Sequence, residues 1–200
     1  FAEIQLLPEL SFRTNAAYNF RGTLQKEYRT TEIGDAIGIG SATRTNYMRR
    51  DFTWNQTLTY DKAFGNHNVK VLAGHENIDY KYDYLYGYKR KQVLEDMYEF
   101  GNFVDNSSLN SSFYRRSKEG WFGRVNYDFN EKYLLEGSIR WDGTSRFAND
   151  VRWQSFWSAG AGWVISKENF LSNVKGIDFL KLRGSYGEVG NDGLDSWYAY

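Results

Sequence analysis

Apolar and polar residues alternate through the stretch from Trp121 to Gly143, in two runs joined by a small polar turn. A period of two predicts a pair of antiparallel β-strands, each with one apolar and one polar face. The apolar rows are Trp121, Gly123, Val125, Tyr127 and Phe129 in the first run, and Tyr133, Leu135, Gly137, Ile139 and Trp141 in the second. Such a face needs a cover, which is either a protein core or lipid.

The same alternation recurs along most of the chain. It predicts strands over residues 10–20, 51–60, 69–84, 153–165 and 179–187, and the first residues, FAEIQ, have the pattern of a strand end. We therefore expect an all-β chain of about seven strands. In the strand at 69–84 the apolar residues have odd numbers before Gly74 and even numbers after it, which is a change of parity. This change indicates either a β-bulge or a strand that leaves its apolar environment.

Two polar segments, Arg21–Tyr47 and Leu85–Glu119, are predicted to be long loops because glycines or polar residues replace the alternation. The spacing of Val93, Leu94, Met97 and Tyr98 allows one short helix in the second loop. A second brief helix is predicted over 166–174, with Ser166 as its N-cap and Glu168 in its first turn.

Long and short connections alternate along the chain, with the short ones expected at Asp61–His67, Phe129–Lys132 and Ser166–Asp178. Short turns at one end and longer loops at the other are typical of an outer-membrane β-barrel. Aromatic residues also sort into two levels, as interfacial girdles do. One level holds Tyr18, Phe52, Trp54, Trp141, Trp157 and Tyr186, and the other holds Tyr60, Phe64, Tyr127, Phe129, Tyr133, Trp163 and Phe179. The pattern favours a transmembrane antiparallel up-and-down barrel over a soluble β-sandwich.

The composition supports this fold class and excludes several functions. Aromatic residues make up 18% of the chain, and these fit both strands and membrane interfaces. The formal net charge is +0, so no strong field is present to attract nucleic acid. No apolar run reaches the roughly 18 residues that a membrane helix needs, so any spanning element must be a strand.

The sequence predicts no catalytic residue, no cofactor-binding residue and no metal site. The chain has no cysteine, and its two histidines, His67 and His75, are too far apart along the strand to share one metal ion unaided. The carboxylates of Glu136, Asp142 and Glu188 are more readily explained by charges alternating on a polar strand face than by a glycosidase acid and base.

Several ordered motifs resemble the barrel segment of the SusC/RagA family of TonB-dependent outer-membrane transporters. They are WFGRVNYDFNEKYLLEGSIRWDGTSRF, SFWSAGAGWVIS and LKLRGSYGEVGN, preceded by LTYDKAFGNHNVKVLAGHE. The resemblance covers nearly the whole chain and is weakest in the predicted loops. It implies that residues 1–200 are part of a receptor barrel of about 22 strands, without the plug domain, TonB box or signal peptide.

The resemblance also implies a function and partners. These are import of glycans or peptides across the outer membrane of a Gram-negative, Bacteroidetes-like cell, driven by the TonB complex through the missing N-terminal part. The implied partner is a SusD-like lipoprotein, and the surrounding medium is outer-membrane lipid. No enzyme activity, cofactor or nucleic-acid partner is implied.

In such a wall the side chains of the polar rows point to the lumen or the plug, and those of the apolar rows point to lipid. The expected inward residues are Arg13, Asn15, Asn55, Arg124, Asn126, Glu136 and Arg140. Substrate contacts are expected from loop residues in Tyr28–Thr43 and Lys89–Tyr114. Two alternatives remain open at this point. One is a soluble all-β carbohydrate-binding module that stacks sugars on Trp141, Trp153 and Trp157, and the other is a passive porin.

Overall fold

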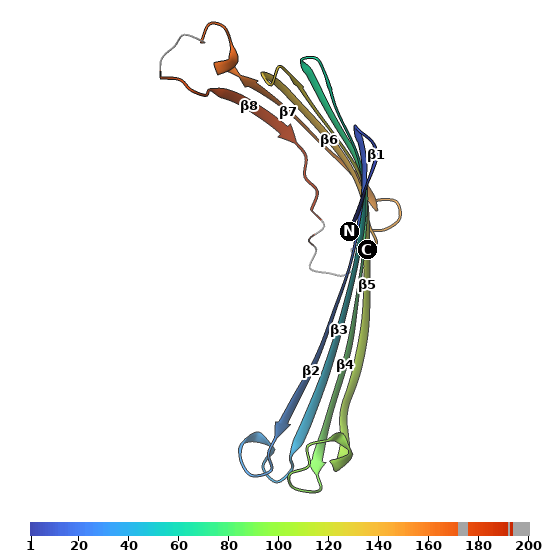
Figure 1. Ribbon diagram of the computed structural model, residues 1–200. Helices are drawn as coiled ribbons and strands as arrows, with labels where there is room; N and C mark the ends of the chain where they lie inside the picture. The colour runs from blue at the N-terminus through green and yellow to red at the C-terminus, as the bar shows by residue number, and fades with distance from the viewer. Residues whose placement is uncertain (172–175, 192, 194–200) are drawn as a thin grey trace. The chain divides into compact units, whose positions relative to one another are not determined.

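The computed structural model describes residues 1–171, 176–191 and 193. These residues form one antiparallel sheet in which eight strands pair in chain order, from β1 to β8 (Figure 1). The strands are β1 (Ala2–Leu7), β2 (Leu10–Arg29), β3 (Ser41–Phe64), β4 (His67–Gln92), β5 (Phe103–Phe129), β6 (Tyr133–Thr144), β7 (Trp153–Val164) and β8 (Lys181–Gly187). The all-β, antiparallel, up-and-down fold class is confirmed, with eight strands where about seven were expected.

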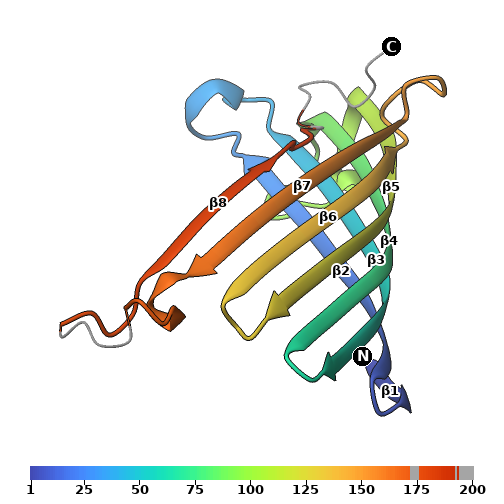
Figure 2. The same ribbon diagram turned by 90° about the horizontal axis from the view of Figure 1, so that it is seen from above.

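The chain divides into two compact units. Unit 1 comprises 1–17, 53–78 and 117–200, and unit 2 comprises 18–52 and 79–116. Strands β2 to β5 therefore run through both units, whereas β1, β6, β7 and β8 belong to unit 1. Figure 2 shows β6, β7 and β8 of unit 1 lying side by side.

The predicted hairpin between Trp121 and Gly143 is present, and its register is regular. Trp121 pairs with Trp141, Val125 with Gly137, and Phe129 with Tyr133. Residues of the same apolar row are thus direct cross-strand neighbours, which is the arrangement that stabilises a sheet face. A shift of one residue would move every apolar side chain to the other face, so the pattern itself specifies this register.

The predicted long loops are much shorter in the structure, because the strands extend far beyond the apolar rows. β2 continues to Arg29, β3 begins at Ser41, and β4 continues to Gln92 before β5 begins at Phe103. The segments Arg21–Tyr47 and Leu85–Glu119 were therefore wrongly predicted as loops over most of their length. In these extensions polar residues occupy both faces, so no apolar row marks them as strands, although the ladder of main-chain hydrogen bonds continues.

Neither predicted helix forms in the described residues. Residues 93–99 are irregular, and only Phe100–Asn102 form a 3₁₀ turn (η2). In the second case a 3₁₀ turn (η3) spans Ile165–Lys167, so Ser166 lies inside the turn and Val164 is its N-cap. Residues 172–174 of that predicted helix lie outside the described residues.

The connections differ in length at the two ends of the strands. Only Gly65 and Asn66 separate β3 from β4, and only 130–132 separate β5 from β6. The other end carries 30–40, 93–102 and 145–152. The connection over 165–180 does not follow this sorting, because it lies at the short-turn end and is long. The prediction that Ser166–Asp178 is a short turn was wrong.

Strand β4 is continuous through Gly74, where the sequence pattern changes parity. A Cβ added to Gly74 would meet the Phe122 ring at 2.3 Å, and Glu76 accepts a hydrogen bond from Arg140. His75 instead contacts Trp121, the neighbour of Phe122 that points to the other side. Alternation therefore holds from Gly74 to Glu76, which favours a strand that leaves its apolar environment over a bulge.

Candidate functional site: the two faces of the sheet and the loop cluster

The apolar face of unit 1 extends from the predicted hairpin across four strands. Tyr133 pairs with Trp163 and Ile139 with Trp157 between β6 and β7. Ala159 pairs with Tyr186 and Trp163 with Leu182 between β7 and β8. Each of these strands therefore places apolar residues beside the apolar residues of its neighbour, and the face is continuous from β5 to β8.

None of the residues that the structure describes covers this face. Val125, Leu135 and Ile139 are 47%, 55% and 59% exposed. Among the described residues, the buried apolar side chains are only Ala36, Ala42, Phe103 and Val164, and none belongs to this face. A continuous exposed apolar surface of this kind marks contact with a membrane or another protein.

Aromatic residues lie at both ends of the apolar face, as the sequence predicted. Phe129, Tyr133 and Trp163 are cross-strand neighbours at the short-turn end. At the other end Trp157 contacts Tyr186 with ring centroids 5.7 Å apart. From Trp121 to Phe129 the strand covers about 27 Å at roughly 3.4 Å per residue, or about 20 Å across a membrane at a tilt of roughly 40°. That height is close to the roughly 25 Å band of outer-membrane barrels.

Glu168 joins the aromatic residues at the short-turn end. Its carboxylate accepts hydrogen bonds from Tyr133 Oη at 2.7 Å, Lys132 Nζ at 3.0 Å and Trp163 Nε1 at 3.0 Å. These donors stabilise the charged carboxylate, with the Tyr133 bond the largest cause, so the pKa of Glu168 lies below its ordinary value of 4.5. The sequence placed Glu168 near a helix N-terminus, whereas it anchors the turn to β6 and β7.

A polar cluster marks the other end of the apolar face. His75 Nδ1 lies 2.9 Å from Gln56 Oε1, and His75 Nε2 lies 3.3 Å from Glu119 Oε1. Trp121 Nε1 donates to the same Glu119 oxygen at 3.3 Å, and its ring lies 4.3 Å from the His75 ring, centroid to centroid. Gln56, which breaks the apolar row of its strand in the sequence, is thus part of this cluster. A membrane–water interface accommodates polar and aromatic side chains at the same depth.

The opposite face of unit 1 carries ion pairs and hydrogen bonds. Arg124 and Glu136 lie 3.6 Å apart, and the hydroxyls of Ser138 and Ser158 are 2.7 Å apart. Arg140 Nε donates to Asp142 at 2.7 Å. Arg140 also donates from Nη2 to Glu76 at 3.0 Å. Arg124, Glu136 and Arg140 therefore share the polar side, as predicted, and two of the suspected acid–base carboxylates, Glu136 and Asp142, face arginines.

Another predicted inward residue, Arg13, pairs with Glu3 across β1 and β2 at 2.8 Å. At Asn55 the main-chain oxygen accepts a hydrogen bond from Thr14 Oγ1 at 3.3 Å, which joins β2 to β3 without involving the Asn55 side chain. A hollow of about 690 Å³ opens on the polar face, lined by Glu76, Arg140, Arg152 and Phe156 among others. Its mixed charges suit water-filled surroundings rather than lipid.

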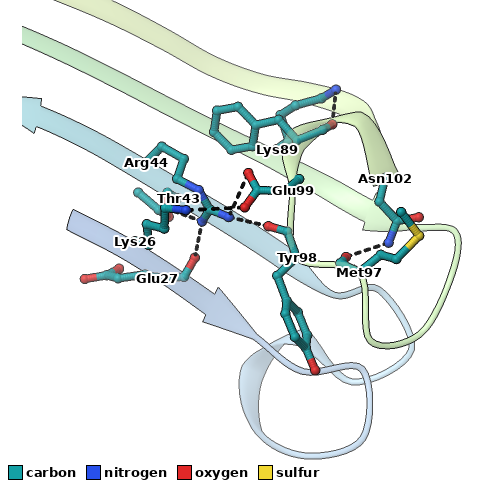
Figure 3. Close-up of polar contacts among 10 residues, drawn as sticks. Lys26, Glu27, Thr43, Arg44, Lys89, Met97, Tyr98, Glu99 and Asn102 are labelled. Atoms are coloured by element: carbon teal, nitrogen blue, oxygen red, sulfur yellow. Dashed lines mark hydrogen bonds and ion pairs between the residues drawn. The ribbon is translucent and has the colours of Figure 1, made fainter. Parts of the chain in front are cut away.

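A compact loop cluster occupies unit 2, and the sequence did not predict it. The Arg44 guanidinium donates to the main-chain oxygens of Glu27, Thr43 and Tyr98 and lies 3.7 Å from the Glu99 carboxylate. Figure 3 shows Arg44 among these partners, with Lys26 also facing Glu99. Because Arg44 reaches both strand ends and the loop, it holds residues 93–102 against β2 and β3.

Asn102 organises the same loop from within. Its side-chain amide donates to the main-chain oxygens of Leu94 and Met97, each at 2.7 Å, and its Oδ1 accepts from the Leu94 amide at 2.9 Å. These bonds satisfy main-chain groups that a helix would otherwise pair internally. They explain why 93–98 folds as a loop although its apolar spacing allowed a helix.

The described residues contain no group of three or more His, Cys, Asp or Glu side chains placed to hold a metal ion. His67 contacts Tyr127 Oη at 2.8 Å and lies apart from the His75 cluster. In the same part of the chain, no helix has the length and apolar character to cross a membrane.

The comparison with protein families identifies this sheet. The family described as TonB dependent receptor-like, beta-barrel matches residues 3–200. The chain belongs to this family. TonB-dependent receptor P39 from Formosa agariphila is 31% identical over 96% of this chain and 19% of its own length. TonB-dependent receptor P3 of the same organism is 28% identical over 98% of this chain and 20% of its own length.

The resemblance to SusC/RagA transporters is confirmed by two further similarities. TonB-dependent receptor SusC from Bacteroides thetaiotaomicron is 29% identical over 80% of this chain and 16% of its own length. The structure of the RagAB peptide transporter superposes with a TM-score of 0.87 at 22% identity, covering 92% of this chain and 21% of that one. This TonB-dependent receptor segment thus spans about a fifth of the length of such relatives.

Proposed function

We propose that this segment is part of the wall of an outer-membrane transporter that imports glycan or peptide oligomers. The observation that carries the proposal is the uncovered apolar face of β5 to β8 between two aromatic levels. Membership of the TonB-dependent receptor family supports it. In this role the apolar side meets the hydrocarbon of the outer membrane, and the ion pairs around Arg140 face the lumen or the plug. The segment performs no reaction.

The proposal includes the two partners that the family resemblance implies. Import is driven by the TonB complex through an N-terminal part of the parent protein, and a SusD-like lipoprotein presents the substrate at the cell exterior. The ends of β2 to β5 that carry the loops over 30–40 and 93–102 face the exterior. The turns at Gly65 and Asn130 face the periplasm. Such an arrangement agrees with the short periplasmic turns and longer exterior loops of known barrels.

The two alternatives differ from this proposal in measurable ways. A soluble carbohydrate-binding module that used Trp141, Trp153 and Trp157 would be released from cells by salt without detergent. A passive porin would import its solutes without the TonB complex. The soluble module does not explain why aromatic residues gather at both ends of one exposed apolar face, whereas a porin has the same kind of wall and differs only in how transport is driven.

The test uses cells that express the full-length parent protein and take up fluorescent oligosaccharides or peptides. Uptake should cease when either the parent protein or the TonB complex is removed, and a lipoprotein should co-purify with the parent protein in detergent. Uptake that continues without the TonB complex would favour the porin. An epitope tag in 93–102 should be accessible to antibody on whole cells, whereas a tag at Gly65 should not.

A further inference from the structure

Unit 2 presents a cluster of tyrosine rings drawn from three adjacent strands. Tyr47 of β3 has ring centroids 6.2 Å from Tyr82 and 5.4 Å from Tyr84 of β4, and Tyr82 lies 6.1 Å from Tyr114 of β5. Along β4 the rings of Tyr84 and Tyr86 stack at 6.5 Å. These five side chains, and that of Tyr80 in the same strand β4, are only partly buried. We call Tyr47, Tyr80, Tyr82, Tyr84, Tyr86 and Tyr114 the tyrosine face.

Two arginines extend the tyrosine face at Tyr80. The guanidinium carbon of Arg49 lies 4.9 Å from the centroid of the Tyr80 ring, and that of Arg116 lies 5.5 Å from it. Arg49 is also paired with Asp51 at 2.9 Å, so its charge is balanced. Arg49 thus adds a flat, hydrogen-bonding group whose charge is balanced, and Arg116 adds a second guanidinium beside the same ring.

The loop cluster lies on the other side of the sheet from the tyrosine face. Arg44, which binds the loop, and Tyr47 occupy positions of opposite parity in β3, so their side chains point to opposite faces. In β4 a Cβ on Gly87 would meet the Phe100 ring of the loop at 2.7 Å, and Gly87 has the parity opposite to Tyr82 and Tyr84. The loop therefore leaves the tyrosine face uncovered.

The tyrosine face has the parity of the polar side of β4. Residues Gly74, Glu76, Tyr80 and Tyr82 all have even numbers in this one continuous strand. Alternation places them on one side of the strand. In the proposed transporter this side is the lumenal one, so the rings line the entry path rather than meet lipid.

The position of these rings in the sheet favours one class of ligand. β3, β4 and β5 are interior strands with a neighbour on each side, so their main-chain groups are already used and a peptide cannot bind them by strand addition. Recognition must come from side chains, which here are partly exposed rings with hydroxyl tips. Flat rings of this type pack against the apolar faces of pyranose units while polar groups bind sugar hydroxyls.

We propose that the tyrosine face is an oligosaccharide-binding surface on which successive sugar rings stack as the substrate enters. This inference rests on the proposed transport function, narrows its substrate from glycans or peptides to oligosaccharides, and gives the binding surface a location. Tyr47, Tyr82 and Tyr114 form its centre across three strands, and Arg49 and Arg116 bind hydroxyl or acidic groups of the sugar at one end. The opposite side of unit 2, with the loop cluster, has no part in this binding.

The test measures binding of a panel of hexasaccharides and a pool of hexapeptides to the full-length protein in detergent by calorimetry. At least one hexasaccharide should bind. Tyr82→Leu should weaken that binding about tenfold, since it removes the stacking ring. Tyr82→Phe keeps the ring and should change the affinity by less than about threefold. Phe52→Leu, at an exposed residue of β3 with the parity opposite to Tyr47, is the matched control and should have no effect.

The outcomes separate this inference from the transport function. Unchanged saccharide affinity in folded Tyr82→Leu protein, or no binding by any hexasaccharide, would overturn the site. Binding of hexapeptides alone would overturn the substrate class. If TonB-dependent uptake in cells persists at the wild-type rate in Tyr82→Leu, the site is wrong although the transporter stands. Saccharide binding without TonB-dependent uptake would instead refute the proposed function.

Discussion

Gly74 of β4 lies directly beneath the ring of Phe122 in β5. A Cβ added at Gly74 would come within 2.3 Å of that ring, and the Arg140 guanidinium lies 5.4 Å from the centroid of the same ring. The absence of a side chain at Gly74 therefore lets Phe122 lie flat on the polar face beside Arg140. This contact links β4, β5 and β6 on the side that we assign to the lumen.

Gly74→Ala should destabilise the full-length protein by about 1–3 kcal/mol, because the added methyl group overlaps the Phe122 ring. Urea unfolding of protein reconstituted in bilayers measures the change. In the double variant Gly74→Ala/Phe122→Leu, part of the loss should be recovered, because the smaller side chain can move away. Strictly additive losses would show that the two residues do not interact.

Asn102→Ala should loosen the loop over 93–102 while leaving the barrel folded. The substitution leaves the Leu94 amide and the Met97 oxygen without their side-chain partner, whereas the Leu94 oxygen keeps Gln92 Nε2 at 2.8 Å. We expect the free energy of local opening to fall by about 2 kcal/mol. Hydrogen exchange of the loop amides measures this opening. Asn110→Ala, at an exposed position of β5, is the control and should leave the loop amides as slow as in the wild type.

The stability of the turn at Glu168 should depend on pH. The pKa of this carboxyl is lowered from 4.5 by hydrogen bonds from Tyr133, Lys132 and Trp163. A lowered pKa means that the bonds stabilise the turn fully above pH about 4.5 and that this stabilisation is lost as the pH falls through the lowered pKa. Hydrogen exchange at Ile165–Lys167 should therefore accelerate in acid, beyond the intrinsic pH dependence, and Glu168→Gln should remove the effect. A profile unchanged by Glu168→Gln would contradict the assignment.

Val125 lies midway between the aromatic residues Trp121 and Phe129 and should be near the membrane midplane. Val125→Arg should destabilise folding into bilayers by about 2–4 kcal/mol. Asn126→Arg, at the next residue and on the polar face, should cost clearly less because that side chain reaches water or plug groups. Equal losses at the two positions would argue against opposite environments.

A close-packed protein core would also reject arginine at Val125, so a milder change is needed to distinguish it from lipid. Val125→Leu and Ile139→Leu alter volume and shape without adding charge. If these side chains face fluid lipid, both substitutions should change the free energy of folding little. A close-packed core would be destabilised by the altered volume and shape. Losses above about 1.5 kcal/mol at both positions would indicate a packed core.

The sequence predicted the sheet best where one face is apolar. The hairpin around Val125 was correct in its turn and in the strand ends at Phe129 and Tyr133, although β5 begins at Phe103 and not near Trp121. The observed register is the one that keeps every apolar side chain on one face. The extensions of β2 to β5 were missed because both of their faces are polar. Without an apolar row, alternation does not show where such a strand begins or ends. Gly34 and Gly38 correctly indicated a loop, but that loop covers only 30–40.

The loop cluster and the tyrosine face depend on contacts between distant residues. Tyr80, Tyr82 and Tyr84 were visible as an alternating row, but their partners Tyr47 and Tyr114 fell in segments predicted as loops. Nothing in the sequence marked Asn102, because its role comes from main-chain groups several residues away. Pairing of the extended strands is what brings these side chains together.

The central claim is that the odd-numbered residues of the hairpin over 121–141 face lipid, and nitroxide spin labels test it most directly. The segment contains no cysteine, so single cysteines can be placed at Val125, Leu135 and Ile139 and at their neighbours Asn126, Glu136 and Ser138 in the full-length protein in bilayers. We predict that labels at the first three are accessible to oxygen and shielded from a water-soluble nickel chelate, and that the other three show the reverse or are shielded from both. Equal oxygen accessibility along both rows, without alternation, would contradict the claim that this sheet is a membrane-spanning wall.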